Sequence, residues 1–193
     1  MKSLLKSAAH FLFSLLALPL YCLFRLLSLI GAADSAFASF AQFLSLFPGV
    51  FGVYLRVAFH KFAMTHCDND VVIGFGTLFS QQDTHIHSST YIGPQCNIGK
   101  CTINKNCLIG SGVHILSGKG QHNFDDINTP LKDQGGQFEK VTIGEDSWLG
   151  NGALIMANVG KKCVVAAGSV VVKDIPDYAI VAGNPAKIIK MRK

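Results

Sequence analysis

Ile143-Gly-Glu-Asp-Ser147 and Leu149-Gly-Asn-Gly-Ala153 are two consecutive copies of a six-residue unit that recurs between Ile86 and Val172. An aliphatic residue opens each copy, Gly or another small residue usually follows, and a further small residue stands four positions after the aliphatic one. Other copies in this span are Ile92-Gly-Pro-Gln-Cys96, Ile98-Gly-Lys-Cys-Thr102, Ile103-Asn-Lys-Asn-Cys107, Ile109-Gly-Ser-Gly-Val113, Val159-Gly-Lys-Lys-Cys163 and Val165-Ala-Ala-Gly-Ser169, and an earlier copy, Ile73-Gly-Phe-Gly-Thr77, stands upstream.

A period of six matches neither the 3.6-residue turn of an α-helix nor the two-residue alternation of a simple strand. It is typical of a parallel β-helix, in which short strands joined by tight turns stack coil on coil. With three units in each triangular coil, every aliphatic residue points inward and packs on its copy in the next coil. The alternative is a set of ordinary buried strands with Gly turns, which the number of copies disfavours.

The composition indicates an apolar protein with a modest positive charge. Hydrophobic residues make up 49% of the 193-residue chain and charged residues 15%, and the formal net charge is +5. The six cysteines include no Cys-x-x-Cys pair, and Cys96, Cys107 and Cys163 occupy the small-residue position of the repeat. We therefore expect buried, reduced thiols rather than disulfides or a zinc site, which suits the cytosol.

Two apolar stretches precede the repeat. The first covers residues 1–30, and its uncharged run from Phe11 to Phe24 is shorter than the ~20 residues of a membrane-spanning helix. Asp34 and Ser35 then offer a helix cap, and a second apolar stretch runs from Ala36 to Leu55. We expect two helices here, forming a membrane-associating segment over residues 1–65.

Three interpretations of this segment compete. A signal peptide fits the basic start, and Ala36-Phe37-Ala38 resembles a cleavage site. A helical pack on a soluble assembly is the second. We favour the third, in which residues 1–60 lie in or dip into the cytoplasmic face of a membrane, with basic residues near the lipid headgroups.

The repeat is interrupted once, from Leu116 to Lys140, within a predicted β-helix domain over residues 66–193. A loop of this length in a compact repeat protein is more often functional than idle. The repeat resumes at Val141 and is expected to end near Val172, where Asp174-Ile-Pro176 breaks it and a basic tail follows.

These features together resemble a known family. The ordered signature consists of the hexads, an insert with one His, and three C-terminal motifs: Asp146-Ser-Trp-Leu-Gly-Asn-Gly-Ala153, Val164-Val-Ala-Ala-Gly-Ser-Val-Val-Val-Lys-Asp-Ile-Pro176 and Ala182-Gly-Asn-Pro-Ala-Lys187. It is similar to the left-handed β-helix acyltransferases, in the branch of galactoside, maltose, xenobiotic and polysaccharide O-acetyltransferases. The resemblance covers roughly residues 70–190, and the first 65 residues have no counterpart in the small soluble members.

The resemblance implies transfer of an acetyl group from acetyl-CoA to a hydroxyl, without a metal, in a homotrimer whose active sites lie between subunits. The insert His of the family is the general base, and His122 holds that position here. An imidazole is suited to take the proton of a hydroxyl as it attacks a thioester. Asp125 or Asp126 is a candidate to orient the ring or contact the acceptor.

The resemblance also implies residues for the donor and the acceptor. Asn151 and Ala167 match positions along the pantetheine arm, and Trp148 matches an active-site tryptophan, although an outward side chain packing on another subunit is an alternative. Asn97 is the nearest match for an acceptor-binding Asn. The cations that match the family's CoA phosphate contacts are Lys173, Lys187 and Lys190.

We therefore predict an O-acetyltransferase that acts at the membrane on a glycan or lipid-linked sugar, with a role in polysaccharide biosynthesis and no nucleic-acid partner. A non-catalytic trimeric scaffold tethered to a membrane is one alternative. A zinc lyase like the β-helix carbonic anhydrases is another, but these need a pair of His five residues apart. His85, His87, His114 and His122 provide no such pair.

Overall fold

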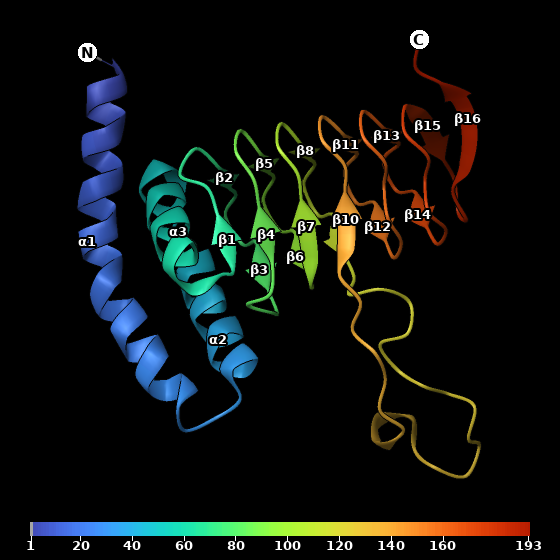
Figure 1. Cartoon of the computed structure of the whole chain (residues 1–193), viewed down its shortest axis with the longest axis horizontal. Helices are drawn as coiled ribbons and strands as arrows, with labels where there is room; N and C mark the ends of the chain where they lie inside the picture. The colour runs from blue at the N-terminus through green and yellow to red at the C-terminus, as the bar shows by residue number, and fades with distance from the viewer. Residues whose placement is uncertain (1) are drawn as a thin grey trace.

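The computed structural model describes residues 2–193, with side chains from residue 4 onward, and shows three helices followed by a β-helix (Figure 1). The helices are α1 (Lys2–Ser28), α2 (Ala33–Ser45) and α3 (Gly49–Ala63). Short strands then stack into three flat sheets along one axis. This architecture is consistent with the left-handed β-helix predicted from the repeat.

Each face of the coil is one sheet, and its strands come from successive coils. The first sheet holds β1 (His66–Cys67), β4 (His85–Ile86), β7 (Cys101–Ile103) and β10 (Val141–Ile143). The second holds β2 (Val72–Ile73), β5 (Tyr91–Ile92), β8 (Leu108–Ile109), β11 (Trp148–Leu149), β13 (Val164–Val165), β15 (Ala179–Ala182) and β16 (Lys187–Met191). The third holds β3 (Leu78–Phe79), β6 (Asn97–Ile98), β9 (His114–Ile115), β12 (Leu154–Ile155) and β14 (Val170–Val171).

The strands pair in parallel and in register, so each aliphatic residue of the repeat lies on its copy in the next coil. Ile73 pairs with Ile92, and Ile92 pairs with Ile109, and all three are fully buried. The small positions are buried as well: the Cys107 thiol donates to the Gly144 carbonyl at 3.2 Å. Burial raises the pKa of that thiol to about 11, so the thiol is a packing group rather than a nucleophile.

The coil continues beyond Val172, and the expected end of the repeat is wrong by about one coil. Ile175 forms an isolated parallel bridge with Val159, and β15 then adds a parallel strand to β13. Pro176 is tolerated because Ile175 is the last bridged residue on this face, so no later coil requires a backbone donor at position 176. The expected basic tail is a strand instead, since β16 pairs antiparallel with β15 and covers the last edge.

The N-terminal segment contains three helices where the sequence analysis expected two. Pro48 is the N-cap of α3 and separates it from α2, whereas Pro19 lies inside an uninterrupted α1. Asp34 is not a cap either. It lies in the first turn of α2, and its carboxylate accepts a hydrogen bond from the backbone amide of Gln82, at a corner of the β-helix, at 2.8 Å.

Helices α2 and α3 pack on the open end of the β-helix. The edge strand β2 pairs with β5 on one side only, so its other side needs partners from elsewhere. Arg56 of α3 supplies one, because its Nε donates to the Ile73 carbonyl at 3.0 Å. Its Nη1 donates to the carbonyls of Phe47 at 2.7 Å and Leu44 at 3.3 Å, near the end of α2. One guanidinium therefore joins the two helices to the first coil.

The pair Arg56 and His60 is fully enclosed at this junction. Arg56 is only 1% exposed, and its burial lowers the pKa of the guanidinium. His60, one turn later, contacts the Arg56 carbonyl through Nδ1 at 2.7 Å, and burial lowers its pKa to about 4. His60 is therefore neutral near pH 7 and adds no second positive charge beside Arg56.

Helix α1 packs on α3 along one face and leaves the opposite face uncovered. Phe24 is fully buried, whereas Leu5, Leu12, Leu16 and Leu23 are largely exposed. By length and composition alone, the part of this helix from Leu4 to Ser28 is long and apolar enough to cross a membrane, a property that signal sequences share. The uncharged run noted in the sequence is shorter than a membrane span, but the helix that contains it extends beyond the run at both ends and reaches a spanning length. Ala36-Phe37-Ala38 lies inside α2, where Phe37 is fully buried.

Replacing Arg56 tests its role at this junction. We expect Arg56→Met to lower the free energy of unfolding by about 2–5 kcal/mol, since each buried carbonyl left without a donor costs ~1–3 kcal/mol. The measurement is denaturant unfolding followed by circular dichroism. Arg25→Met, at the exposed end of α1, is the control and should change stability by less than ~0.5 kcal/mol. Equal stability of the two variants would contradict the assignment.

Candidate functional site

The strands stop at Ile115 and resume at Val141, and the residues between them project away from the coils (Figure 1). Two arms form the base of this insert. The Glu139 amide donates to the Ser117 carbonyl at 3.0 Å, and the Gln137 amide donates to the Gly120 carbonyl at 2.7 Å. A third hydrogen bond, from the Asn123 amide to the Gly135 carbonyl at 2.9 Å, joins the two arms further along the insert. The insert is therefore built on a defined two-armed base.

His122 lies within this base, between the last two of these bonds, and its side chain is exposed. The opposite arm passes very close at Gly136. A Cβ atom added to Gly136 would lie 1.9 Å from the Gln121 carbonyl oxygen and 2.8 Å from the His122 amide nitrogen. Only glycine fits there, so Gly136 is what allows the two arms to meet beside His122.

The tip of the insert is organised by Asp126. Its carboxylate accepts from the Thr129 hydroxyl at 2.6 Å and from the Asn128 amide at 2.9 Å, and these bonds lower the pKa of Asp126. Gln134 donates to the carbonyls of Asp126 and Thr129 and so joins both sides of the tip. These hydrogen bonds of Asp126 all lie within the loop, and the neighbouring Asp125 is exposed.

Asn151 and Ala167 share one corner of the β-helix. The Gly168 amide donates to the Asn151 carbonyl at 2.9 Å, so the two corners stack directly on one another. The Asn151 side chain turns the other way and accepts from the Ser111 amide at 3.1 Å. Trp148 lies on β11 just before this corner, on the outer face, and is about half exposed. The structure thus brings these three residues together along one edge.

The other predicted residues lie elsewhere on the coil. Asn97 is exposed on β6, directly beside His114 of the next coil. Lys187 and Lys190 project from β16, and Lys173 follows β14 at another corner. Within residues 4–193, none of these three lysines takes part in an ion pair shorter than 4.0 Å.

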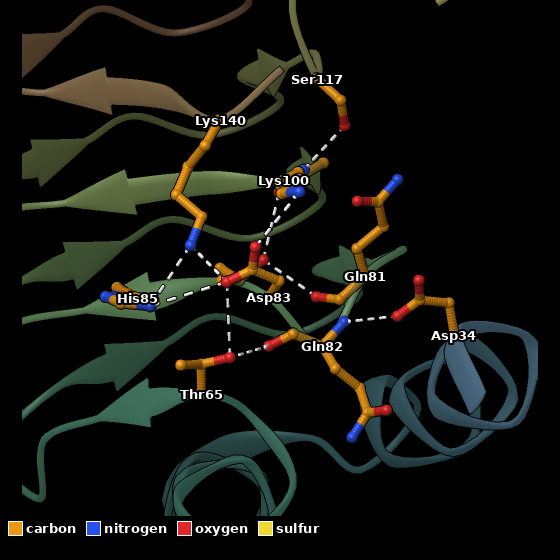
Figure 2. A network of polar contacts seen from close by, with 11 residues as sticks. Asp34, Thr65, Gln81, Gln82, Asp83, His85, Lys100, Ser117 and Lys140 are labelled. Carbon is orange, nitrogen blue, oxygen red and sulfur yellow. Dashed lines mark hydrogen bonds and ion pairs between the residues drawn. The ribbon is translucent and has the colours of Figure 1, made fainter. Parts of the chain in front are cut away.

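A polar network that the sequence analysis missed anchors the insert (Figure 2). Asp83 lies at a coil corner and pairs with Lys140, the residue at which the insert ends, and with Lys100 at 3.2 Å. The Ser117 hydroxyl, near the start of the insert, accepts from the Lys100 amide at 2.8 Å. Both roots of the insert are therefore tied to the corner formed by Gln81–Thr84.

The charges in this network act on one another. The hydrogen bond from Lys140 holds the pKa of Asp83 below its usual value, with a further contribution from Lys100. His85 Nε2 lies 3.3 Å from Lys140 Nζ, and burial together with the Lys140 charge lowers the pKa of that imidazole. No sequence spacing signals this cluster, because Asp83 and Lys140 meet only after the coils have stacked across the insert.

Comparisons with known proteins show what this chain resembles. Residues 83–117 match the family model described as bacterial transferase hexapeptide (six repeats). Over 122 residues the chain is 37% identical to a probable macrolide acetyltransferase of Lysinibacillus sphaericus, covering 55% of this chain and 65% of that protein. Over 112 residues it is 34% identical to a chloramphenicol acetyltransferase of Klebsiella aerogenes, covering 50% and 53%. The chain thus spans less than two thirds of the length of these curated relatives.

Solved structures share the fold. A galactoside acetyltransferase in complex with coenzyme A has a TM-score of 0.70 at 22% identity, over 82% of this chain and 80% of that one. A hexapeptide-repeat acetyltransferase of Vibrio cholerae O1 biovar eltor, complexed with acetyl coenzyme A, has a TM-score of 0.69 at 21% identity, over 84% and 91%. The resemblance to the hexapeptide-repeat acyltransferases is confirmed: this chain carries their repeat and their fold.

The close approach at Gly136 yields a prediction. Gly136→Ala should force the two arms apart, at a cost of ~1–3 kcal/mol. Hydrogen exchange at the amides of Asn123 and Gln137 should accelerate about tenfold or more, while the strand amides keep their rates. Gly120→Ala is the matched control, because its added Cβ would lie 3.7 Å from the Gln137 carbonyl oxygen, an ordinary van der Waals contact. Equal exchange in both variants would show that the arms do not depend on Gly136.

Proposed function

We propose that this protein is a membrane-associated O-acetyltransferase that moves an acetyl group from acetyl-CoA to a hydroxyl of a glycan or lipid-linked sugar. The observation that carries the proposal is the position of His122. Its imidazole is exposed on an insert whose two arms are hydrogen-bonded to each other. The chain that carries this insert is similar to acetyltransferases.

In the proposed reaction His122 is the general base. Its imidazole takes the proton of the acceptor hydroxyl as the oxygen attacks the thioester carbonyl of acetyl-CoA. The tetrahedral intermediate then breaks its bond to sulfur, and the imidazolium returns the proton to the leaving thiolate. The products are an acetyl ester and CoA, and His122 is neutral again. Asp125 and Asp126 are proposed to shape the acceptor side through the tip of the insert, and Asn97 is a further acceptor candidate.

The donor is proposed to lie along the edge formed by Asn151 and Ala167. Small residues at these stacked corners leave the backbone accessible to the pantetheine arm, and Trp148 offers an apolar surface beside them. The CoA phosphates need cations, and Lys173, Lys187 and Lys190 are exposed and free of ion pairs within residues 4–193.

A homotrimer would complete the site. The insert extends away from the coils of its own chain (Figure 1), and we propose that its His122 serves a donor edge on a second copy. The insert also exposes apolar side chains that a neighbouring copy would cover, with Ile127 94% exposed and Phe124 and Leu131 largely exposed. Closed three-fold symmetry provides each copy with the same contact.

Membrane association is proposed to occur through α1 and the adjoining tips of α2 and α3. The exposed apolar face of α1 continues to Phe43 and Leu46 around the end of α2 and to Val50 and Phe51 of α3. Lys6 and Arg25 lie near the two ends of α1, where lipid headgroups would be. Because acetyl-CoA is a cytosolic metabolite, we place the β-helix on the cytoplasmic side.

Replacing the proposed base tests the reaction. His122→Ala should lower kcat by about 10²–10⁴-fold, the usual contribution of general-base catalysis. CoA binding by calorimetry and the oligomeric state by light scattering should be unchanged, because the corner edge and the lysines remain. His114→Ala, an exposed His on the coil itself, is the control and should keep near wild-type turnover. A His122→Ala enzyme with near wild-type kcat would overturn this role for His122.

The membrane proposal is tested on the exposed face of α1. Leu12→Glu with Leu16→Glu places two charges on that face and leaves the buried side of α1 intact. Each charge costs ~2.5–3.5 kcal/mol inside a bilayer, so partitioning into the membrane pellet should fall at least about 100-fold. Tyr91→Glu with Leu108→Glu, on the exposed outer face of the coil, is the matched control and should not change sedimentation. Recovery of the intact wild-type protein in the supernatant would refute the idea.

A further inference from the structure

A cluster of polar side chains lies on the outer face of the first sheet, apart from the residues assigned to acetyl transfer. Cys67 of β1 pairs with Ile86 of β4 and both point into the core. The residues on either side of them therefore point outward. On the first coil these are His66 and Asp68, and on the second they are His85 and His87, so stacking creates a square of four side chains.

Three members of this square converge. The ring centroids of His66 and His87 are 4.7 Å apart, and His66 Nε2 lies 3.3 Å from an oxygen of Asp68. One ligand atom from each of His66, Asp68 and His87 falls within 4.8 Å of the other two. His85 is turned away toward Lys140 and Asp83, and its ring centroid is more than 6 Å from both other imidazoles.

The Nε2 atom of His66 faces Asp68 and is enclosed within the cluster. It makes no hydrogen bond to residues 4–193, and its 3.3 Å contact with the Asp68 carboxylate is an ion pair only when the imidazole is protonated. A buried polar atom without a partner is unfavourable, and native proteins rarely leave one. A positively charged ion between the two imidazoles and the carboxylate would satisfy it.

We propose that His66, Asp68 and His87 bind one divalent metal ion, Zn²⁺ or an ion with the same ligand preference, which links the first coil to the second. Two imidazole nitrogens with one carboxylate oxygen suit Zn²⁺, whereas Mg²⁺ and Ca²⁺ prefer oxygen ligands throughout. Zinc bonds of ~2.0–2.2 Å require tetrahedral donor atoms ~3.3–3.6 Å apart. The His66–Asp68 pair already meets this separation, and His87 needs only a small side-chain adjustment.

The position of the site gives the ion a structural role. Strand β1 is two residues long, is the edge of its sheet, and pairs only with β4. It also follows α3 directly, so it carries the connection from the helices into the β-helix. An ion shared between β1 and the residue after β4 would hold this edge in place. The site is independent of the proposed acetyl transfer, and its test does not use that reaction.

The test is calorimetric titration of ZnCl₂ into the untagged, full-length protein in detergent after removal of metal with EDTA. We expect one ion per chain, with at least about tenfold weaker binding for His66→Ala, His87→Ala and the nearly isosteric Asp68→Asn. His114→Ala is the control and should bind like the wild type. Zinc should also raise the thermal midpoint of the wild type and of His114→Ala, but not that of His87→Ala.

Two results would contradict the metal site. No zinc binding by the wild-type protein would overturn the proposal. So would full-affinity binding by folded Asp68→Asn and His87→Ala, which would assign the ion to other residues. Circular dichroism establishes that each variant is folded, and Asp68→Asn, which keeps the shape of the side chain, provides the measurement if an alanine variant unfolds.

Discussion

The backbone hydrogen bonds between the strands run along the axis of the β-helix, from each coil to the next. The first and last coils therefore have unpaired edges. Helices α2 and α3 and strand β16 cover those edges. At one end Arg56 donates to the Ile73 carbonyl, and the amide of Gly76 donates to the Ser45 carbonyl at the end of α2. At the other end β16 folds back on β15. An open edge would otherwise invite pairing with another chain.

The corner at Gln81–Thr84 connects this cap to the insert. The Gln82 amide donates to Asp34 of α2, and its side chain donates to the carbonyl of Ala63 at the end of α3 at 2.9 Å. The next residue, Asp83, holds Lys140 at the root of the insert. The helices and the insert therefore share one anchor.

The repeat made much of the fold predictable. A six-residue period with an aliphatic residue in each copy leaves few packings other than a stacked coil, and Ile73, Ile92 and Ile109 are buried one upon another as the pattern indicates. The end of the repeat was misjudged because Pro176 breaks the pattern without breaking the coil. The number of helices was misjudged because the apolar stretch from Ala36 to Leu55 was taken as one helix, although a proline can either lie within a helix, as Pro19 does, or separate two helices, as Pro48 does. Only packing decides that one continues α1 and the other begins α3.

The sequence by itself determined which residues face the core and where the repeat is interrupted, because both follow from a short-range period. It also marked the insert that holds His122, since an insert in a regular repeat is visible without a structure, whereas the role of His122 as general base is what the family resemblance implies. Only the tertiary structure decided which distant side chains meet. Asp83 reaches Lys140, Arg56 reaches Ile73, and His66 lies beside His87, through coil stacking and helix docking. Coils of unequal length, one of them carrying the insert, set those contacts, and no fixed spacing along the chain encodes them.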